Sequence, residues 1–158
     1  MIEYESLKGT EYVGGRDDCY GLLRKFYKLN YDLQLANYAR PYGFAHNNLD
    51  LISENLENEG FLPVEISLSR LELGDGIVMA ITRALLANHV GVYVGNNYML
   101  HHLFKQKSSL ENFGDSWKAR TLTVVRHPAV TEKNKLMVRP VVDLTELLPP
   151  HVRARYPM

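Results

Sequence analysis

The chain has 158 residues, and its 18 basic and 18 acidic side chains give a formal net charge of zero at pH 7, so no global electrostatic term favours nucleic acid or an anionic membrane surface. The length is that of one domain able to bury its own apolar core. A single cysteine excludes an internal disulfide and any structural zinc site of the paired-cysteine type.

The N-terminal residues indicate how the protein is made. Met1–Glu5 is acidic and lacks the basic flank and apolar core of a signal peptide, which predicts synthesis in the bacterial cytoplasm without a leader. No apolar run in the sequence approaches the roughly 20 residues that a membrane-spanning helix requires. We therefore expect no membrane insertion.

Two helices are predicted in the first part of the chain. From Asp18 onward, apolar side chains recur at helical spacing for about three turns, with basic residues on the other face and in the last turn. A surface loop rich in Tyr and Asn follows over residues 30–44. The next helix is expected over residues 48–58, with Asn47 or Asn48 as its N-cap.

The middle of the chain has β character. Strand-like segments are expected at residues 61–73, 74–81, 89–94, 98–103 and 122–126. Together with the helix that begins at Asp18, they predict an α+β fold in which this helix packs on one face of an antiparallel meander of about four to six strands. We expect this domain to occupy residues 1–127. Prolines recur after it, which predicts a C-terminal arm over 128–158, with one helical turn near 143–148, that docks onto another protein.

Cys19 falls at the predicted start of the first helix, behind two glycines and two aspartates. Free backbone N–H groups and the macrodipole at such a position favour a thiolate and can hold a developing oxyanion. A lone cysteine is more often a small buried hydrophobe, and Asp18 is most simply a helix N-cap. Cys19 is therefore a candidate nucleophile only if the fold supplies a base.

Three histidines that flank one predicted hairpin could supply this base. Alternate residues of a strand share a face, so a three-residue loop, 95–97, places His101 on the face of His89, whereas a two-residue loop places His102 there. Alternation leaves both registers open. Because His101 and His102 point to opposite faces, a zinc site built from these histidines and Cys19 is disfavoured, and no metal or cofactor is expected.

Four motifs, in this order, resemble those of the NlpC/P60 cysteine peptidases, a branch of the papain-like superfamily. They are Tyr12-Val-Gly-Gly, Asp18-Cys19-Tyr20-Gly-Leu, Gly74-Asp75, and the segment from His89 to His101. The resemblance covers most of residues 10–126. It implies a papain-like fold with Cys19 as nucleophile, His89 as base and His101 as the residue that orients His89, and it thus selects the three-residue loop.

The same resemblance implies a substrate or oxyanion pocket beside the nucleophile. Tyr12 is expected in or near this pocket, with Asp18 and Tyr20 as neighbours. Tyr20 stands where typical members have a serine, so the substrate contacts of that serine are not transferred to this chain.

A narrower resemblance links the chain to the NlpC/P60 domains of tailed-phage tail-assembly and tail-tip proteins. It is carried by the segments 19–24, 37–41, 100–103 and 116–117. The family resemblance implies an endopeptidase that cuts the peptide stems of bacterial peptidoglycan, commonly between D-glutamate and the diamino acid, and the narrower resemblance implies that it cuts the cell wall locally during DNA entry. The virion tail tip, with other tail-tip proteins as partners, would carry it to the host cell wall and periplasm.

Two alternatives to this function stay open. The first is a tail-tip assembly protein that retains the fold with little or no hydrolase activity. The second is a cysteine acyltransferase acting on a lipid or small amide, which the polar and amphipathic residues near Cys19 disfavour.

Overall fold

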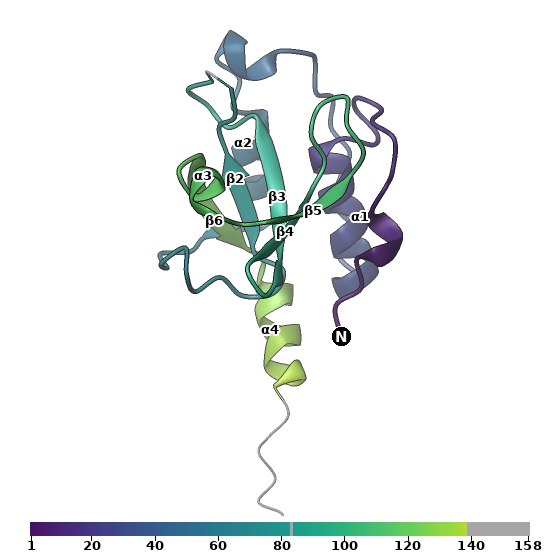
Figure 1. The fold of residues 1–158 in the computed structure, drawn as a ribbon, viewed down its shortest axis with the longest axis vertical. Coiled ribbons are helices and arrows are strands. Elements are labelled where there is room, and N and C mark those ends of the chain that lie inside the picture. The colour runs from purple at the N-terminus through teal and green to yellow at the C-terminus, as the bar shows by residue number, and fades with distance from the viewer. Residues whose placement is uncertain (83, 139–158) are drawn as a thin grey trace, which may run out of the picture.

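The structure, a computed structural model, describes residues 1–82 and 84–138 and has a mixed α and β architecture (Figure 1). The helices are α1 (Cys19–Tyr31), α2 (Leu51–Asn58), α3 (Asp115–Lys118) and α4 (Pro128–Met137), with short 3-10 turns at Glu5–Leu7 and Phe44–Asn47. The strands are β1 (Leu62–Pro63), β2 (Gly76–Met79), β3 (His89–Gly95), β4 (Tyr98–His101), β5 (Ser109–Asn112) and β6 (Thr121–Arg126).

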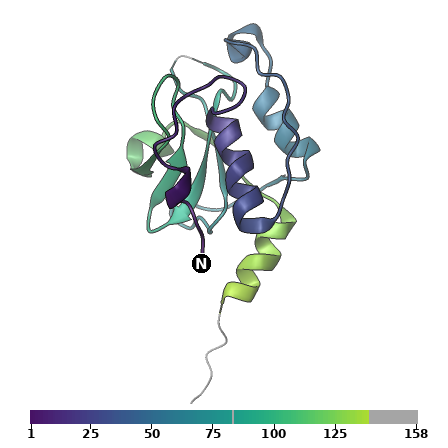
Figure 2. The ribbon, with the colours of Figure 1, turned by 90° about the vertical axis from the view of Figure 1, so that its right-hand side faces the viewer.

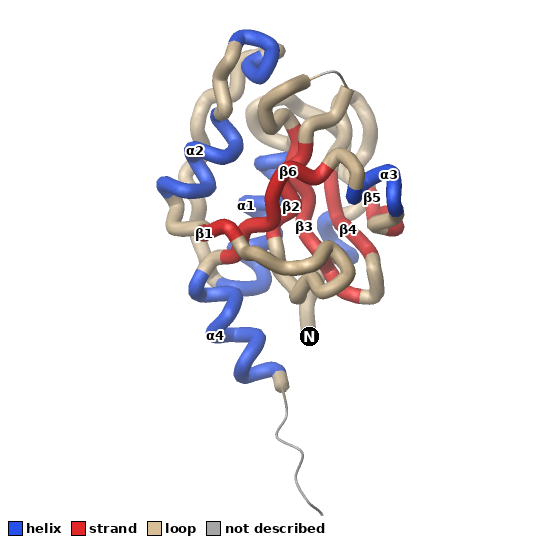
Figure 3. Tube along the Cα trace, turned by 90° about the vertical axis from the view of Figure 1, so that its left-hand side faces the viewer, coloured by secondary structure: helices blue, strands red, loops and turns tan. Residues whose placement is uncertain are grey.

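The strands form one antiparallel sheet of six, in the order β1-β6-β2-β3-β4-β5. The predicted meander is present from β2 to β5. After β5 the chain passes through α3 and returns across the sheet, so β6 pairs with the free edge of β2 (Figure 3). The α+β fold class is therefore confirmed, and the sheet differs from a simple meander by this crossover.

The sheet buries both of its faces. On one face, α1 lies along the strands (Figure 2), and its side chains Leu23 and Phe26 belong to the same core cluster as Val90 and Val92 of β3. The opposite face carries a smaller cluster: Ile77, Met79, Met99 and Phe113, with Trp117 packed against it. Each large apolar side chain buried in this way stabilises the fold by about 1.5–3 kcal/mol.

The starts of α1 and α2 depend on aspartate caps. The Asp18 carboxylate accepts a hydrogen bond from the Gly21 N–H at 2.8 Å, as its N-cap position predicts. In the second helix the cap is Asp50, which accepts from the Ser53 N–H at 3.2 Å. The prediction that Asn47 or Asn48 caps this helix is wrong, because a short 3-10 turn ends there and the helix begins three residues later.

A β-bulge sets the register of the β3–β4 hairpin. Asn96 and Asn97 have positive φ angles of 51° and 63°, the conformation of a two-residue type I′ turn. The pairing then shifts between Tyr93 and Gly95, which inserts one extra residue on β3 and places Gly91 opposite His101. The register that the resemblance selected is thus present, although a tight turn with a bulge produces it in place of a three-residue loop.

The first part of the predicted C-terminal arm is a helix packed on the domain. Val130 of α4 is fully buried in the main core, and the Asn134 amide donates to the Leu73 carbonyl at 2.8 Å. The helical turn expected at residues 143–148 lies outside the described residues. Within the described part of the chain, none of the helices combines the length and apolar character needed to cross a membrane.

Candidate active site

A cavity of about 460 Å³ opens at the N-terminal end of α1. Four of the residues that the family resemblance assigns to the site line it, namely Tyr12, Asp18, Cys19 and His89. The remaining lining residues lie at positions 14–15, 40–45, 81–82, 88, 102 and 104. The fold therefore brings the predicted nucleophile and the predicted base to one cleft from segments 70 residues apart in sequence.

Cys19 is the first residue of α1. Backbone N–H groups of Val90 and Tyr20 face its sulfur and favour the thiolate, but burial and then the charge of Asp18 raise the pKa of Cys19 to about 11. Burial therefore outweighs the backbone N–H groups that favour the thiolate at this helix start. In the free cleft Cys19 is a protonated thiol at neutral pH.

His89 and His101 form a buried pair. His89 Nε2 lies 3.0 Å from His101 Nδ1, within hydrogen-bonding distance, and the side chains project from the same face of the sheet. Burial, and next the neighbouring His101 and His102, lower the pKa of His89 to about 3. His89 is therefore a neutral imidazole at neutral pH, which is the form that accepts a proton.

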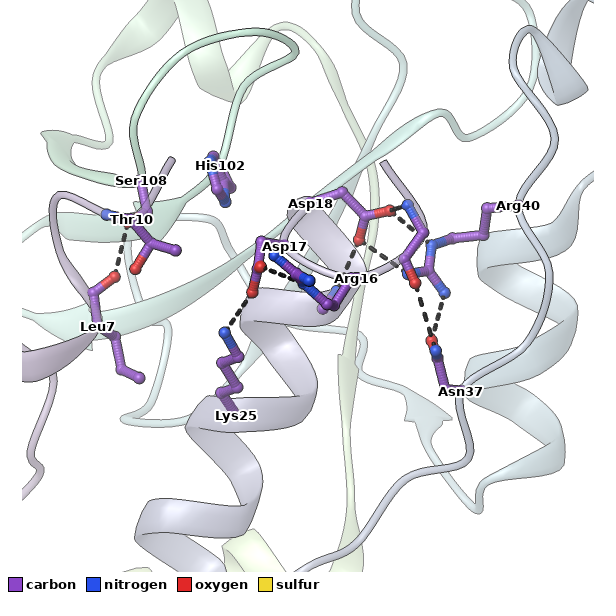
Figure 4. A network of polar contacts seen from close by, with 12 residues as sticks. Leu7, Thr10, Arg16, Asp17, Asp18, Lys25, Asn37, Arg40, His102 and Ser108 are labelled. Carbon is purple, nitrogen blue, oxygen red and sulfur yellow. Dashed lines mark hydrogen bonds and ion pairs between the residues drawn. The ribbon is translucent and has the colours of Figure 1, made fainter. Parts of the chain in front are cut away.

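Asp18 holds the turn that precedes the nucleophile (Figure 4). Its two oxygens accept from the backbone N–H groups of Gly15 and Gly21, both at 2.8 Å. The Arg40 guanidinium binds both oxygens as well, at 2.9 and 3.0 Å. With these four bonds, the polar capacity of the carboxylate is used within the chain, and Asp18 acts on the site by fixing the backbone on either side of Cys19.

Two aromatic rings and the Asp18 carboxylate surround the Arg40 side chain. Its side chain is 3% exposed, and its guanidinium lies 5.0 Å from the ring centre of Tyr20 and 5.1 Å from that of Tyr38. These are distances at which a cation is attracted to the face of an aromatic ring. The ion pair with Asp18 therefore packs against these two aromatic rings, and both charged residues line the cleft.

The two tyrosines predicted near the substrate lie in different places. Tyr12 lines the cavity, and burial, followed by the charges of Asp18 and Cys19, raises its pKa, so its hydroxyl stays a hydrogen-bond donor. Tyr20 is 0% exposed and packs against Tyr38, with 4.4 Å between ring centres. Only its backbone N–H reaches the Cys19 sulfur, so a substrate contact from the Tyr20 side chain is not part of the function proposed below.

Sequence reasoning did not identify four residues that contribute to this region. Arg40 lies in a loop, where an arginine is normally exposed, and no local pattern indicates that it turns inward. Phe104 and Tyr42 form an aromatic rim on the cleft, with 5.6 Å between ring centres. Glu111 lies on β5, and alternation along this strand would have placed it on the face of His101 had a strand been predicted there. Across the described residues, no three His, Cys, Asp or Glu side chains are grouped as a metal site would need.

Comparison with known proteins gives consistent matches. The sequence model of the NlpC/P60 family matches residues 9–126. Over 123 residues the chain is 31% identical to tail tip assembly protein K of Escherichia phage lambda, a match covering 78% of this chain and 60% of that protein. Tail tip assembly protein K of Escherichia phage N15 is 28% identical over 121 residues, covering 75% of this chain and 48% of that protein. The chain thus spans about half the length of these phage proteins.

A solved structure shares the fold. The crystal structure of the NlpC/p60 domain of the peptidoglycan hydrolase SagA superposes with a TM-score of 0.51 at 20% sequence identity. The superposition covers 77% of this chain and 90% of the SagA chain. The similarity therefore extends over nearly the whole of that domain.

Proposed function

The chain belongs to the NlpC/P60 family, and on this premise we propose that it is a cysteine peptidase with Cys19 as nucleophile, His89 as general base and His101 as the residue that orients His89. The observation that carries the proposal is the convergence of Cys19 and His89 on one cavity, with His89 backed by His101 at 3.0 Å. A thiol, a neutral imidazole and a second ring nitrogen behind it are the parts that acyl transfer requires.

The reaction begins with two neutral groups. The Cys19 thiol gives its proton to His89 as the sulfur attacks the carbonyl carbon of the scissile amide. The oxyanion is held by the Cys19 backbone N–H at the helix start, together with the protonated hydroxyl of Tyr12. His89 passes the proton to the leaving amine, which departs and leaves a thioester. Water then attacks the thioester, giving one proton back to His89 and from there to the sulfur.

The substrate class follows from the family. We propose the peptide stems of bacterial peptidoglycan, cut between D-glutamate and the diamino acid. The cleft is lined by hydroxyl, amide and charged groups as well as by the aromatic rim of Tyr42 and Phe104, which suits a peptide that carries charges better than a lipid chain.

The phage relatives suggest where the protein acts. Two proteins named tail tip assembly protein K match most of this chain, so we propose that it is a tail component that works with other tail-tip proteins and opens the cell wall locally. The residues after 127 would contribute to docking in the tail. The packing of α4 on the domain makes the segment beyond this helix the better candidate for such a contact.

A second candidate function is assembly of the tail tip without hydrolysis. Two observations favour it: the phage relatives are named as tail tip assembly proteins, and the pKa of the Cys19 thiol is raised. The two candidates differ in what the loss of the nucleophile does to the phage particle.

The test uses the purified full chain and isolated peptidoglycan, with release of new amino termini as the readout. The parent should release them, and Cys19→Ala should reduce the rate by orders of magnitude without changing the unfolding midpoint, because the half-buried Cys19 side chain lines the cavity and is replaced by an apolar group only slightly smaller. A folded parent that releases none would contradict the peptidase. In virions carrying Cys19→Ala, normal tails with poor DNA entry support hydrolysis, whereas normal tails with unimpaired DNA entry support assembly without hydrolysis. In particles that lack the chain, missing tails support assembly.

A further inference from the structure

Glu111 of β5 lies directly behind the histidine pair. Its Oε1 is 3.1 Å from His101 Nε2, and its Oε2 accepts a hydrogen bond from Trp117 Nε1–H at 3.1 Å. Trp117 belongs to α3, which lies beside β5 (Figure 3), and its ring meets the His101 ring edge-on with 4.9 Å between centres. Polar contacts thus run without a gap from His89 through His101 and Glu111 to the indole of Trp117.

The contact between His101 and Glu111 is short but bent. The nitrogen is fully buried and has no well-aligned hydrogen-bond partner among the described residues. Glu111 still supplies a charged acceptor at 3.1 Å, and its side chain, 39% exposed, has room to adjust. At this distance the Glu111 carboxylate opposes the lowering of the His101 pKa by burial, so the two groups interact electrostatically although the bond is not well aligned.

A carboxylate at the end of this series of contacts determines which ring nitrogen of each histidine carries the proton. An ionised carboxylate only accepts hydrogen bonds, so it holds His101 in the form with the proton on Nε2. His101 Nδ1 then carries a lone pair and accepts from His89 Nε2–H. This leaves His89 Nδ1 unprotonated, the one ring nitrogen that is free to take the proton of the Cys19 thiol.

We propose that Glu111 is a positioning residue that fixes the tautomers of both histidines and thereby keeps His89 in the form that acts as a base. The inference rests on the proposed function for its catalytic meaning, but the proton positions themselves do not depend on any substrate. Trp117 takes part by holding the second carboxylate oxygen.

Glu111→Gln is the informative substitution because Trp117 dictates how the new amide lies. Indole N–H only donates, so it takes the amide oxygen and leaves the NH₂ group facing His101 Nε2. A donor at this position favours the opposite tautomer, in which His101 Nδ1–H donates to His89 Nε2 and the proton of His89 moves to Nδ1. The base is then blocked although no atom of the pair has been removed.

The direct measurement is ¹⁵N NMR of the imidazole nitrogens in the full chain, which distinguishes protonated from unprotonated ring nitrogens. In the parent, Nε2 of both His89 and His101 should carry the proton, and in Glu111→Gln both protons should lie on Nδ1. A parent with the proton on Nδ1 of His101 overturns the inference even if no variant folds. Unchanged tautomers in a folded Glu111→Gln protein overturn it as well.

Activity gives an independent readout. Glu111→Gln should lower kcat by at least about 100-fold, with little change in KM, since it removes a working general base. Adding Trp117→Phe frees the amide to turn its oxygen to His101 and should recover part of both the tautomer and the rate. Glu132→Gln, on the exposed face of α4, is the matched control and should leave the histidine tautomers and kcat unchanged.

The two proposals fail in different ways. The expected tautomers in a parent that cleaves no peptide would uphold the role of Glu111 and contradict the peptidase. An active parent whose rate is unaffected by Glu111→Gln would uphold the peptidase and contradict the role of Glu111.

Discussion

Removal of the Arg40 side chain should destabilise the protein far more than the loss of an ordinary surface ion pair. The Arg40 and Asp18 side chains are 3% and 8% exposed, and two hydrogen bonds join them. Arg40→Met keeps the bulk of the stem but leaves the Asp18 charge buried without its partner. Such a loss costs about 3–5 kcal/mol in the free energy of unfolding.

The measurement is urea unfolding at pH 7, followed by tyrosine and tryptophan fluorescence. Lys28→Met is the matched control, because it breaks a pair with Asp32 whose side chains are 56% and 89% exposed, and this should cost no more than about 1 kcal/mol. Asp18→Asn combined with Arg40→Met removes the stranded charge and should recover part of the loss. If Arg40→Met is no less stable than Lys28→Met, the buried pair does not hold the turn before Cys19.

Three further predictions concern packing and pH. Gly21→Ala should unfold the domain or strongly lower its melting temperature, because the added Cβ would lie 2.0 Å from the Arg16 carbonyl oxygen. Gly14→Ala is the control, since its Cβ meets only ordinary contacts at 3.8 Å, and thermal melting compares the two variants. Val130→Ala should lower the free energy of unfolding by about 1.5–3 kcal/mol in chemical denaturation, since the side chain is fully buried. Leu136→Ala, at a position that is 85% exposed, should lower it by less than about 0.5 kcal/mol. Equal small losses would show that α4 is not part of the domain. The folded-state pKa of His89, about 3, is below its ordinary value of 6.5, so the unfolded state binds more protons between these values and the stabilisation present above pH 6.5 is lost as the pH falls. Between pH 6 and 5, His89→Gln should therefore flatten the decline of unfolding free energy by up to about 1.4 kcal/mol per pH unit, and an unchanged slope would contradict the depressed pKa.

The sequence predicts the local parts of the site well. Helical periodicity and an aspartate cap place Cys19 at the start of α1, and alternation limits the partner of His89 to His101 or His102. The choice between these two depends on a bulge at Val94, which has no sequence signature distinct from an ordinary strand residue. The order of the family motifs selected His101, a choice that periodicity left open.

Long-range contacts account for most of what the sequence does not show. β5 has four residues and weak β character, so its pairing with β4 provides the stability that its own residues lack. The crossover that brings β6 beside β2 is a property of the whole sheet. Arg40 is buried because Asp18, Tyr20 and Tyr38 surround it, and two of these three, Asp18 and Tyr20, are distant from it in sequence.

The charge state of the cleft explains why orientation matters so much at this site. Cys19 and His89 are both neutral before substrate binds, since burial raises the pKa of the thiol and lowers that of the imidazole. A preformed thiolate would need no precise acceptor, but a thiol must transfer its proton during the attack, and only a ring nitrogen with a free lone pair can receive it. In the proposed reaction, the burial that makes the pair neutral would thus make activity depend on the tautomer of His89. In the inference drawn above, the series of polar contacts that ends in the Glu111 carboxylate fixes this tautomer.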